Sequence, residues 1–116
     1  MTQLTLRIAA RPNGTARLVQ ALNYFMVQTK LQPGCVDCQI YAEAANPQSL
    51  LYMERWATQQ DAEAELRSQR FGTLLSIMET APAAPTLEIC TVSEQRGLEY
   101  VEALRLEPRG AGRKRG

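Results

Sequence analysis

Histidine is missing from this 116-residue sequence, and cysteine occurs only three times. Histidine is the commonest general base, the commonest metal ligand and the usual proximal ligand of haem, so each of these roles would fall to another side chain. An odd number of cysteines in a cytosolic-looking chain argues against a disulfide framework. We therefore predict no metal site and no disulfide scaffold.

A strong charge imbalance and long apolar runs are also missing. The formal net charge is +1, which creates no global field toward nucleic acid or a membrane. No apolar run approaches the roughly 20 residues that a membrane span requires, and the N-terminus lacks the apolar core of a signal peptide. We therefore expect a cytoplasmic protein with no nucleic-acid partner and no membrane partner.

The length suits one domain with its own core, and the apolar share of 45% is ordinary for a globular protein. We expect residues 1–93 to form this domain and residues 94–107 to form an extension. Residues 108–116 are predicted to be a disordered basic tail that serves solubility rather than binding to nucleic acid or anionic lipid. The basic residues of this tail are Arg109, Arg113, Lys114 and Arg115.

Apolar alternation and helical spacing predict six elements before residue 93. Leu4, Leu6 and Ile8 share one face of a first strand, and an apolar stripe marks the helix that follows, with Asn13 as its cap. Thr58 caps a second helix, which breaks or bends near Gly72. The expected strands cover residues 2–10, 36–43, 50–56 and 86–92, and the expected helices cover residues 15–30 and 59–78.

The order strand, helix, strand, strand, helix, strand predicts an α+β protein with the ferredoxin-like βαββαβ plait. This fold has a four-stranded antiparallel sheet with both helices on one face. In a monomer the other face would leave Leu51 and Met53 exposed. A homodimer that packs sheet against sheet would cover them, so we expect a second copy as partner.

The pattern between Leu98 and Leu106 fits two structures. Leu98, Tyr100 and Leu104 share the parity of a strand, whereas Leu98, Val101 and Leu104 would suit a helix. We favour an extended segment that contacts the partner subunit.

The expected strand from Leu50 to Trp56 has large side chains on both faces, which is typical of a strand covered on both sides. Glu54 and Arg55 lie in its middle, where a charge needs a partner, water or a cavity. This strand is therefore a candidate wall for a small-molecule pocket.

Tyr52, Glu54 and Trp56 point to the same side of this strand and are the main candidate site residues. They would place a phenol hydroxyl, a carboxylate and an aromatic face around one cavity. Burial beside Trp56 would raise the pKa of Glu54 and suit it to take a proton from a phenol. Two plainer interpretations stay open: Trp56 is simply core, or Glu54 forms a structural ion pair with one of Arg7, Arg55 and Arg70.

The Cys35-x-x-Cys38 spacing invites a redox or metal interpretation. Redox pairs of this kind depend on a helix N-terminus, whereas this pair enters a strand, where residues three apart point to opposite faces. A zinc site would need two more ligands, and only Cys90 is left. We expect Cys38 and Cys90 to be small core residues.

Several short segments, in this order and spacing, resemble the antibiotic biosynthesis monooxygenase family of dimeric α+β barrels. The resemblance covers roughly Leu4 to Val92. Its residues are Gln32-Pro33-Gly34-Cys35, Asn46-Pro47, Tyr52-Met53-Glu54-Arg55-Trp56, and then Ala62, Leu66, Ser68 and Phe71. It implies a homodimer whose two sheets form a barrel, with a pocket in each subunit between sheet and helices. Oxygenase members oxidise polycyclic phenols to quinones without metal or flavin, while other members bind haem or act on quinols.

The functional residues of the family carry over only in part. The family's pocket tryptophan matches Trp56, but Tyr52 stands where the best-described oxygenases have an asparagine, and Ala62 stands where they have a tyrosine. Many members have a histidine at the position of Glu65, and haem-degrading members ligate iron through a histidine at the position of Leu75. Haem cleavage of that kind is thereby excluded, and phenol oxygenation stays open.

The sequence is therefore compatible with three functions. The first is a cofactor-independent monooxygenase acting on a phenolic or quinol-type aromatic small molecule, with Glu54 and Tyr52 as catalytic residues. Its substrate-binding residues would be Trp56, Tyr52, Phe71, Leu75 and Phe25. The second is a non-catalytic small-molecule-binding dimer of the same fold, and the third is thiol redox chemistry at Cys35 and Cys38.

Overall fold

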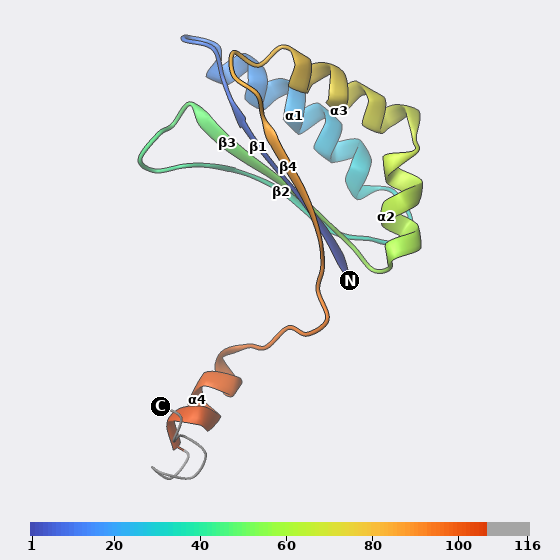
Figure 1. Ribbon diagram of the computed structural model, residues 1–116, viewed down its shortest axis with the longest axis vertical. Coiled ribbons are helices and arrows are strands. Elements are labelled where there is room, and N and C mark those ends of the chain that lie inside the picture. The colour runs from blue at the N-terminus through green and yellow to red at the C-terminus, as the bar shows by residue number, and fades with distance from the viewer. Residues whose placement is uncertain (107–116) are drawn as a thin grey trace.

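Four strands and four helices make up the part of the chain described by a computed structural model, residues 1–106 (Figure 1). The basic tail expected over residues 108–116 lies outside the described residues. The elements are β1 (Thr2–Ala9), α1 (Thr15–Lys30), β2 (Cys35–Ala42), β3 (Ser49–Trp56), α2 (Gln59–Leu66), α3 (Gln69–Glu79), β4 (Thr86–Thr91) and α4 (Leu98–Leu106).

The strands form one antiparallel sheet in the order β2-β3-β1-β4. Helices α1, α2 and α3 lie on the same side of this sheet in Figure 1. This arrangement confirms the predicted α+β ferredoxin-like fold. It places β3, the strand of the candidate site, inside the sheet between β2 and β1.

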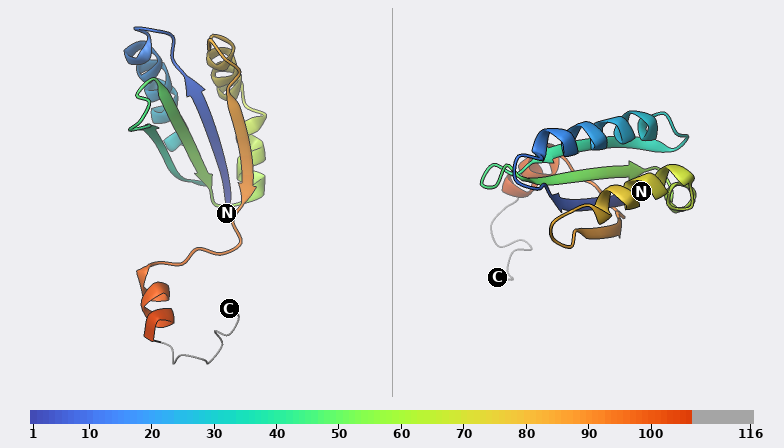
Figure 2. Two further views of the ribbon diagram at one scale, coloured as in Figure 1. Left: turned by 60° about the vertical axis from the view of Figure 1, so that its left-hand side comes forward. Right: turned by 90° about the horizontal axis from the view of Figure 1, so that it is seen from above.

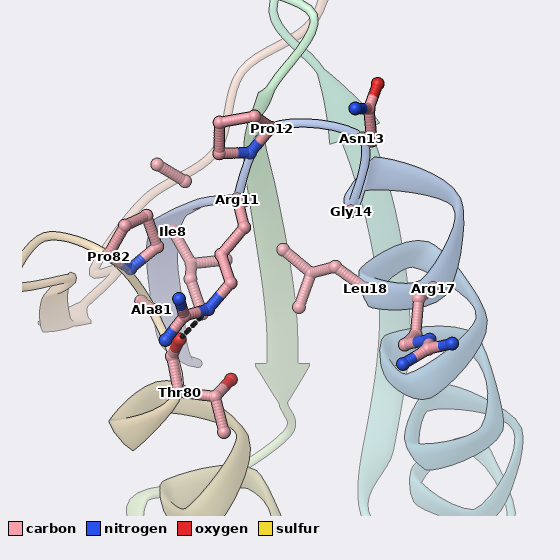
Figure 3. A pocket seen from close by; sticks show the side chains of 11 residues that line it. Ile8, Arg11, Pro12, Asn13, Gly14, Arg17, Leu18, Thr80, Ala81 and Pro82 are labelled. Atoms are coloured by element: carbon pink, nitrogen blue, oxygen red, sulfur yellow. Dashed lines mark hydrogen bonds between the residues drawn. The ribbon is translucent and has the colours of Figure 1, made fainter.

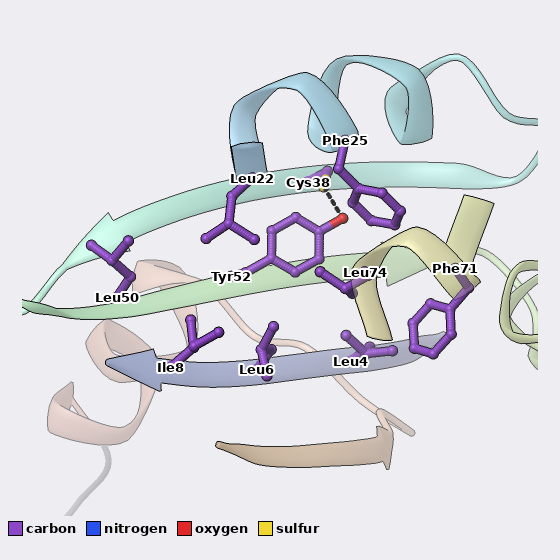
Figure 4. Packing of buried hydrophobic residues seen from close by; sticks show 10 residues of the cluster. All are labelled: Leu4, Leu6, Ile8, Leu22, Phe25, Cys38, Leu50, Tyr52, Phe71 and Leu74. Carbon is purple, nitrogen blue, oxygen red and sulfur yellow. Dashed lines mark hydrogen bonds between the residues drawn. The ribbon is translucent and has the colours of Figure 1, made fainter. Parts of the chain in front are cut away.

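The core lies between the sheet and the helices, because alternate residues of β1 and β3 point to the same side (Figure 4). Leu6 of β1 pairs with Tyr52 of β3, and both are fully buried. Helices α1 and α3 contribute four side chains to this core, namely Leu22, Phe25, Phe71 and Leu74. Burying a side chain of this size contributes about 1.5–3 kcal/mol relative to leaving it exposed. A slip of one residue would turn all these side chains to the other face, so their burial fixes the strand register.

The prediction of a cap for the first helix is wrong. Asn13 does not cap α1: its φ of 62° is left-handed, and Gly14 is the N-cap residue, with no side-chain cap bond. The predicted break in the second helix is confirmed, since the segment forms two helices, but the break lies at Arg67 and Ser68 rather than at Gly72. Ser68 stops one helix and starts the next, because its hydroxyl accepts a hydrogen bond of 3.1 Å from the backbone N–H of Phe71.

The other predicted cap is confirmed. The hydroxyl of Thr58 accepts a hydrogen bond of 3.1 Å from the backbone N–H of Asp61 at the start of α2. The same hydroxyl donates a hydrogen bond of 2.9 Å to the Asp61 carboxylate. These two bonds orient α2 over the end of β3, next to Trp56.

Residues 98–106 form helix α4 instead of the extended segment that we favoured. The helix lies away from the sheet, beyond the end of β4, and none of its residues is buried (Figures 1 and 2). An extended segment there would leave its backbone unpaired, whereas a helix satisfies its own hydrogen bonds. Among the described residues, no helix has the length and apolarity needed to cross a membrane.

Candidate functional site

Tyr52, Glu54 and Trp56 form a chain of hydrogen bonds on the inner face of β3. The Tyr52 hydroxyl donates to Glu54 Oε2 at 2.6 Å, and the Trp56 indole N–H donates to Glu54 Oε1 at 2.9 Å. The Cys38 thiol on β2 donates to the Tyr52 oxygen at 3.1 Å. All four side chains are buried, so the three residues singled out by strand parity do come together.

Burial changes the acid–base behaviour of this chain. Desolvation raises the pKa of Glu54 from its ordinary 4.5 to about 7, although the bonds from Tyr52 and Trp56 oppose the shift. Burial and the neighbouring Glu54 also raise the pKa of Tyr52 above its ordinary value. The pKa of Cys38 is raised to about 12, again mainly by burial. Near neutral pH, Glu54 can therefore either hold or release a proton, while Tyr52 and Cys38 stay protonated.

Glu54 forms no ion pair with another described residue. Arg7 pairs with Glu43, the Arg55 Nε donates to Gln3 at 3.1 Å, and Arg70 pairs with Glu65. Each of the three arginines considered as a structural partner for Glu54 is thus engaged elsewhere. The interpretation of Glu54 as half of a structural ion pair is wrong.

A cavity of about 220 Å³ lies beside Trp56, between the end of β3, the turn after α1 and helices α2 and α3. Tyr52 and Glu54 are not in its lining, because the space around them is filled by the core. Trp56 therefore separates the cavity from the buried carboxylate. The lining residues are Gln32, Pro33, Trp56, Asp61, Ala64, Glu65, Ser68 and Arg70.

Glu65 and Arg70 form an ion pair in the lining of this cavity, and no pattern in the sequence predicted them as a site. The Arg70 guanidinium donates to Glu65 Oε1. The Glu65 side chain is 1% exposed and the Arg70 side chain is 19% exposed. Glu65 Oε2 and Arg70 Nε are buried without any hydrogen-bond partner. The signal available in the sequence was that Glu65 stands where many members of the resembled family have a histidine.

Of the other three predicted substrate-binding residues, two lie in the core and one is exposed. The Phe25 ring packs edge-on against Tyr52, with centroids 5.6 Å apart, and Phe71 is buried against β1 (Figure 4). Leu75 is 44% exposed on α3. None of them lines the cavity beside Trp56.

The two cysteines of the Cys35-x-x-Cys38 segment face the same side of the sheet, contrary to the strand-parity argument. A β-bulge between Cys35 and Asp37 adds one residue, so Cys35 pairs with Trp56 and Cys38 with Glu54. Both thiols are free, and burial raises the pKa of each. Raised pKa values keep them protonated, which disfavours redox chemistry. Cys38 is a core residue as predicted, whereas Cys90 is exposed.

A larger cavity, of about 570 Å³, lies at the opposite end of the sheet, between the start of α1 and the end of α3 (Figure 3). Ile8 and Leu18 form apolar walls, and the Arg11 Nε donates to the Thr80 carbonyl at 3.2 Å. Its lining contains no carboxylate and no aromatic ring, so it offers no base for a phenol. Within residues 1–106, no group of three histidine, cysteine or acidic side chains is placed to hold a metal ion.

The chain matches the family model described as antibiotic biosynthesis monooxygenase over residues 1–74. A comparison with curated proteins finds no match. The family match runs from β1 to the first half of α3, and so contains Tyr52, Glu54, Trp56 and the Glu65–Arg70 pair.

Solved structures of several bacterial proteins share the fold. One is classed as an antibiotic biosynthesis monooxygenase, from Deinococcus radiodurans; it is 15% identical, with a TM-score of 0.75, 84% of this chain covered and 98% of that chain. Rv0793 from Mycobacterium tuberculosis is 15% identical, with a TM-score of 0.72 and coverage of 83% and 98%. A protein of the same class from Nitrosomonas europaea is 17% identical, with a TM-score of 0.71 and coverage of 81% and 100%. At these identities the likeness concerns the fold.

Proposed function

This chain belongs to the antibiotic biosynthesis monooxygenase family, and from that membership we propose that it is a cofactor-independent monooxygenase of a phenolic or quinol-type aromatic small molecule. One observation carries the proposal. A buried carboxylate with a pKa of about 7, Glu54, is hydrogen-bonded to the tryptophan that walls a cavity. A carboxylate of this kind can take a proton from a phenol near neutral pH.

In the proposed complex, the substrate ring stacks on Trp56 in the cavity. Its hydroxyl reaches Glu54 when the Trp56 indole N–H leaves Glu54 Oε1, 2.9 Å away, and the hydroxyl takes that place. Tyr52 keeps its bond to Glu54 Oε2 and holds the carboxylate in position. Glu54 then accepts the phenol proton and leaves an electron-rich phenolate.

The phenolate and dioxygen supply all the electrons of the reaction. One electron passes from the phenolate to dioxygen, giving a phenoxyl radical and superoxide, and these combine at a ring carbon to form a C–O bond. The peroxide takes up the proton held by Glu54, and the ring carbon then loses its hydrogen as a proton. Cleavage of the O–O bond releases water and leaves a quinone. The protein's part is to bind, deprotonate and exclude water.

Oxygen consumption by purified full-length protein tests the proposal. With a panel of naphthols, anthrones and quinols, we expect uptake of dioxygen with at least one member, at a rate that rises as pH passes through about 7 because Glu54 must be deprotonated. Glu54→Gln should reduce this rate by about 100-fold or more, since general-base catalysis contributes about 10²–10⁴-fold.

Glu79→Gln is the matched control, because Glu79 is an exposed carboxylate on α3, outside the lining of the cavity beside Trp56, and its replacement should leave the rate unchanged. No uptake with any member of the panel, or full activity of Glu54→Gln, would reject the proposed chemistry.

The second candidate is a non-catalytic small-molecule-binding protein of the same fold. It is favoured by one specific observation: Tyr52 and Glu54 are enclosed by the core and do not line the cavity. In that case Trp56 fluorescence would respond to an aromatic ligand while dioxygen is not consumed. Under both candidates we propose a cytoplasmic homodimer, as the family membership implies.

A further inference from the structure

Two residues that line the cavity beside Trp56, Glu65 and Arg70, each carry a buried polar atom that nothing in the described chain satisfies. Glu65 Oε2 accepts no hydrogen bond and Arg70 Nε donates none, although the two side chains are joined through Glu65 Oε1. Leaving a buried donor or acceptor unpaired costs about 1–3 kcal/mol, and more for a charged group. Two such atoms on one ion pair indicate a site that a ligand completes.

The two unpaired atoms differ in chemistry. Glu65 Oε2 can only accept a hydrogen bond while the carboxylate is ionised, and Arg70 Nε can only donate one. Since one ion-pair contact joins the two side chains, a small ligand that displaces this contact can engage both of them. A complementary ligand therefore carries a hydroxyl that donates to Glu65 and a neighbouring oxygen that accepts from Arg70.

Exposure suggests how a ligand reaches this pair. The Glu65 side chain is 1% exposed and lies deep, whereas the Arg70 side chain is 19% exposed and lies closer to solvent. Arg70 is long and rotatable, so a shift of its guanidinium opens the way to Glu65 without moving a backbone element. The Ser68 hydroxyl, also in the lining, already donates to the Glu65 carbonyl at 2.7 Å.

The size of the cavity limits the ligand. Sites for drug-sized molecules usually enclose about 300–1,000 Å³. The cavity beside Trp56 measures about 220 Å³, which suits one or two fused rings but not a polycyclic phenol of four rings.

We propose that Glu65 and Arg70 are the specificity-determining pair of this site, and that they select a one- or two-ring aromatic with two adjacent oxygen substituents, at least one of them a hydroxyl. Catechol-type diols and aromatic ortho-hydroxy ketones belong to this class. The inference rests on the proposed function for the nature of the reaction, but it concerns recognition and is tested by binding alone.

Binding can be followed through Trp56, which is the single tryptophan of the chain and lines the cavity. The probes are two naphthalenediols of equal composition, one with adjacent hydroxyls and one with hydroxyls on separate rings. We expect quenching of Trp56 fluorescence in the full-length protein by both, with the adjacent diol bound at least about tenfold more tightly, because only it satisfies both atoms.

Two conservative variants assign the preference to the pair. Glu65→Gln keeps the shape of the side chain and removes the carboxylate, while Arg70→Lys keeps the positive charge and removes the Nε donor. Each should reduce the preference for the adjacent diol to about twofold or less. The matched controls are Glu63→Gln and Arg67→Lys, which alter an exposed pair 3.6 Å apart on the same segment and should keep the full preference. Thermal melts establish that each variant is folded.

The outcomes separate this inference from the proposed function. Equal affinity for the two diols, or a preference that survives in Arg70→Lys, overturns the recognition pair, and dioxygen uptake then decides the enzyme question by itself. Preferential binding of the adjacent diol without dioxygen uptake supports the pair and rejects the monooxygenase. Absence of quenching by either diol overturns the inference, whatever the protein does with dioxygen.

Discussion

Glu54 is an acid in an apolar layer, and its two oxygens are each held by one donor, Tyr52 and Trp56. Neither donor carries a charge, and the two charged neighbours oppose each other, since Glu65 raises the pKa of Glu54 and Arg70 lowers it. The consequence is a carboxyl group that resists ionisation and therefore couples the protonation of the site to folding. That coupling can be measured without knowing the substrate.

The stability of the protein should fall as pH rises from about 4.5 to about 7, because the pKa of Glu54 rises from 4.5 when unburied to about 7 in the fold. In this window the folded state holds a proton that the unfolded state has released, so the contribution is complete below pH 4.5 and lost above pH 7. We expect the free energy of unfolding to fall by up to about 3 kcal/mol. Urea denaturation at a series of pH values measures it.

Glu54→Gln has no proton to release and should flatten that profile, whereas Glu79→Gln should keep the wild-type slope because Glu79 is exposed on α3. A wild-type stability that stays constant across this range would show that Glu54 is solvated or paired, contrary to its surroundings in the fold.

The residues of the site differ in how well the sequence predicted them. Tyr52, Glu54 and Trp56 were found because residues two apart in a strand always share a face. Glu65 and Arg70 were missed because the break was predicted near Gly72, beyond both residues, and residues five apart in an unbroken helix lie about 140° from each other. The break at Ser68 between α2 and α3 removes that separation. A helix break set by one capping hydroxyl is a weak signal in a sequence.

At the scale of elements, the break predicted near Gly72 does not occur at that glycine, whereas Gly34, predicted to help end the first helix, has a left-handed backbone conformation. Gly72 lies inside α3, and an added Cβ would meet no atom within 4 Å. Gly34, at the entry to β2, has a φ of +84°, and an added Cβ would overlap the Asp61 side chain. The sequence alone showed Pro33-Gly34 as a stop and could not show how closely α2 approaches it.

The two glycines give opposite predictions for the same substitution. Gly72→Ala should stabilise the protein by about 0.5–1 kcal/mol, because alanine reduces the entropy of the unfolded chain and fits the helix. Gly34→Ala should destabilise it by at least about 1 kcal/mol, because it combines a left-handed backbone with a steric overlap. Urea denaturation at a single pH compares both with wild type. A stabilising Gly34→Ala would mean that α2 does not pack against this turn.

The remaining difference between prediction and structure concerns α4 and the bulge in β2. Apolar alternation suggested a strand for residues 98–106, but a strand forms only where another strand offers pairing, and none of the described strands lies beside this segment. The bulge between Cys35 and Asp37 could not be predicted from alternation either, because the extra residue interrupts the alternation of side chains along the strand. Both cases depend on the surroundings of a segment, whereas the order of β1 to β4 followed from local patterns.

For the whole molecule, the radius of gyration is 18.1 Å, well above the roughly 13 Å expected for a compact chain of this length. The excess comes from α4, which lies away from the sheet with Leu98, Val101 and Leu104 all exposed (Figure 2). On the sheet face opposite the helices, Leu51 and Met53 are only partly buried, next to the exposed Tyr41. These two apolar surfaces are what a homodimer of the proposed kind would cover.

Met53 is the residue on which the homodimer can be tested, because it lies at the centre of the open sheet face, paired with Thr5 on β1 and Gln39 on β2. We expect the wild-type chain to sediment as a dimer and Met53→Asp to sediment as a folded monomer, since a buried unpaired carboxylate at a symmetric interface would be present twice. Val27→Asp is the control, because Val27 is 53% exposed on α1 and lies away from this face. Sedimentation velocity over a range of concentrations distinguishes the species. A wild-type monomer at all concentrations, or a Met53→Asp dimer as tight as wild type, would show that this face is not the interface.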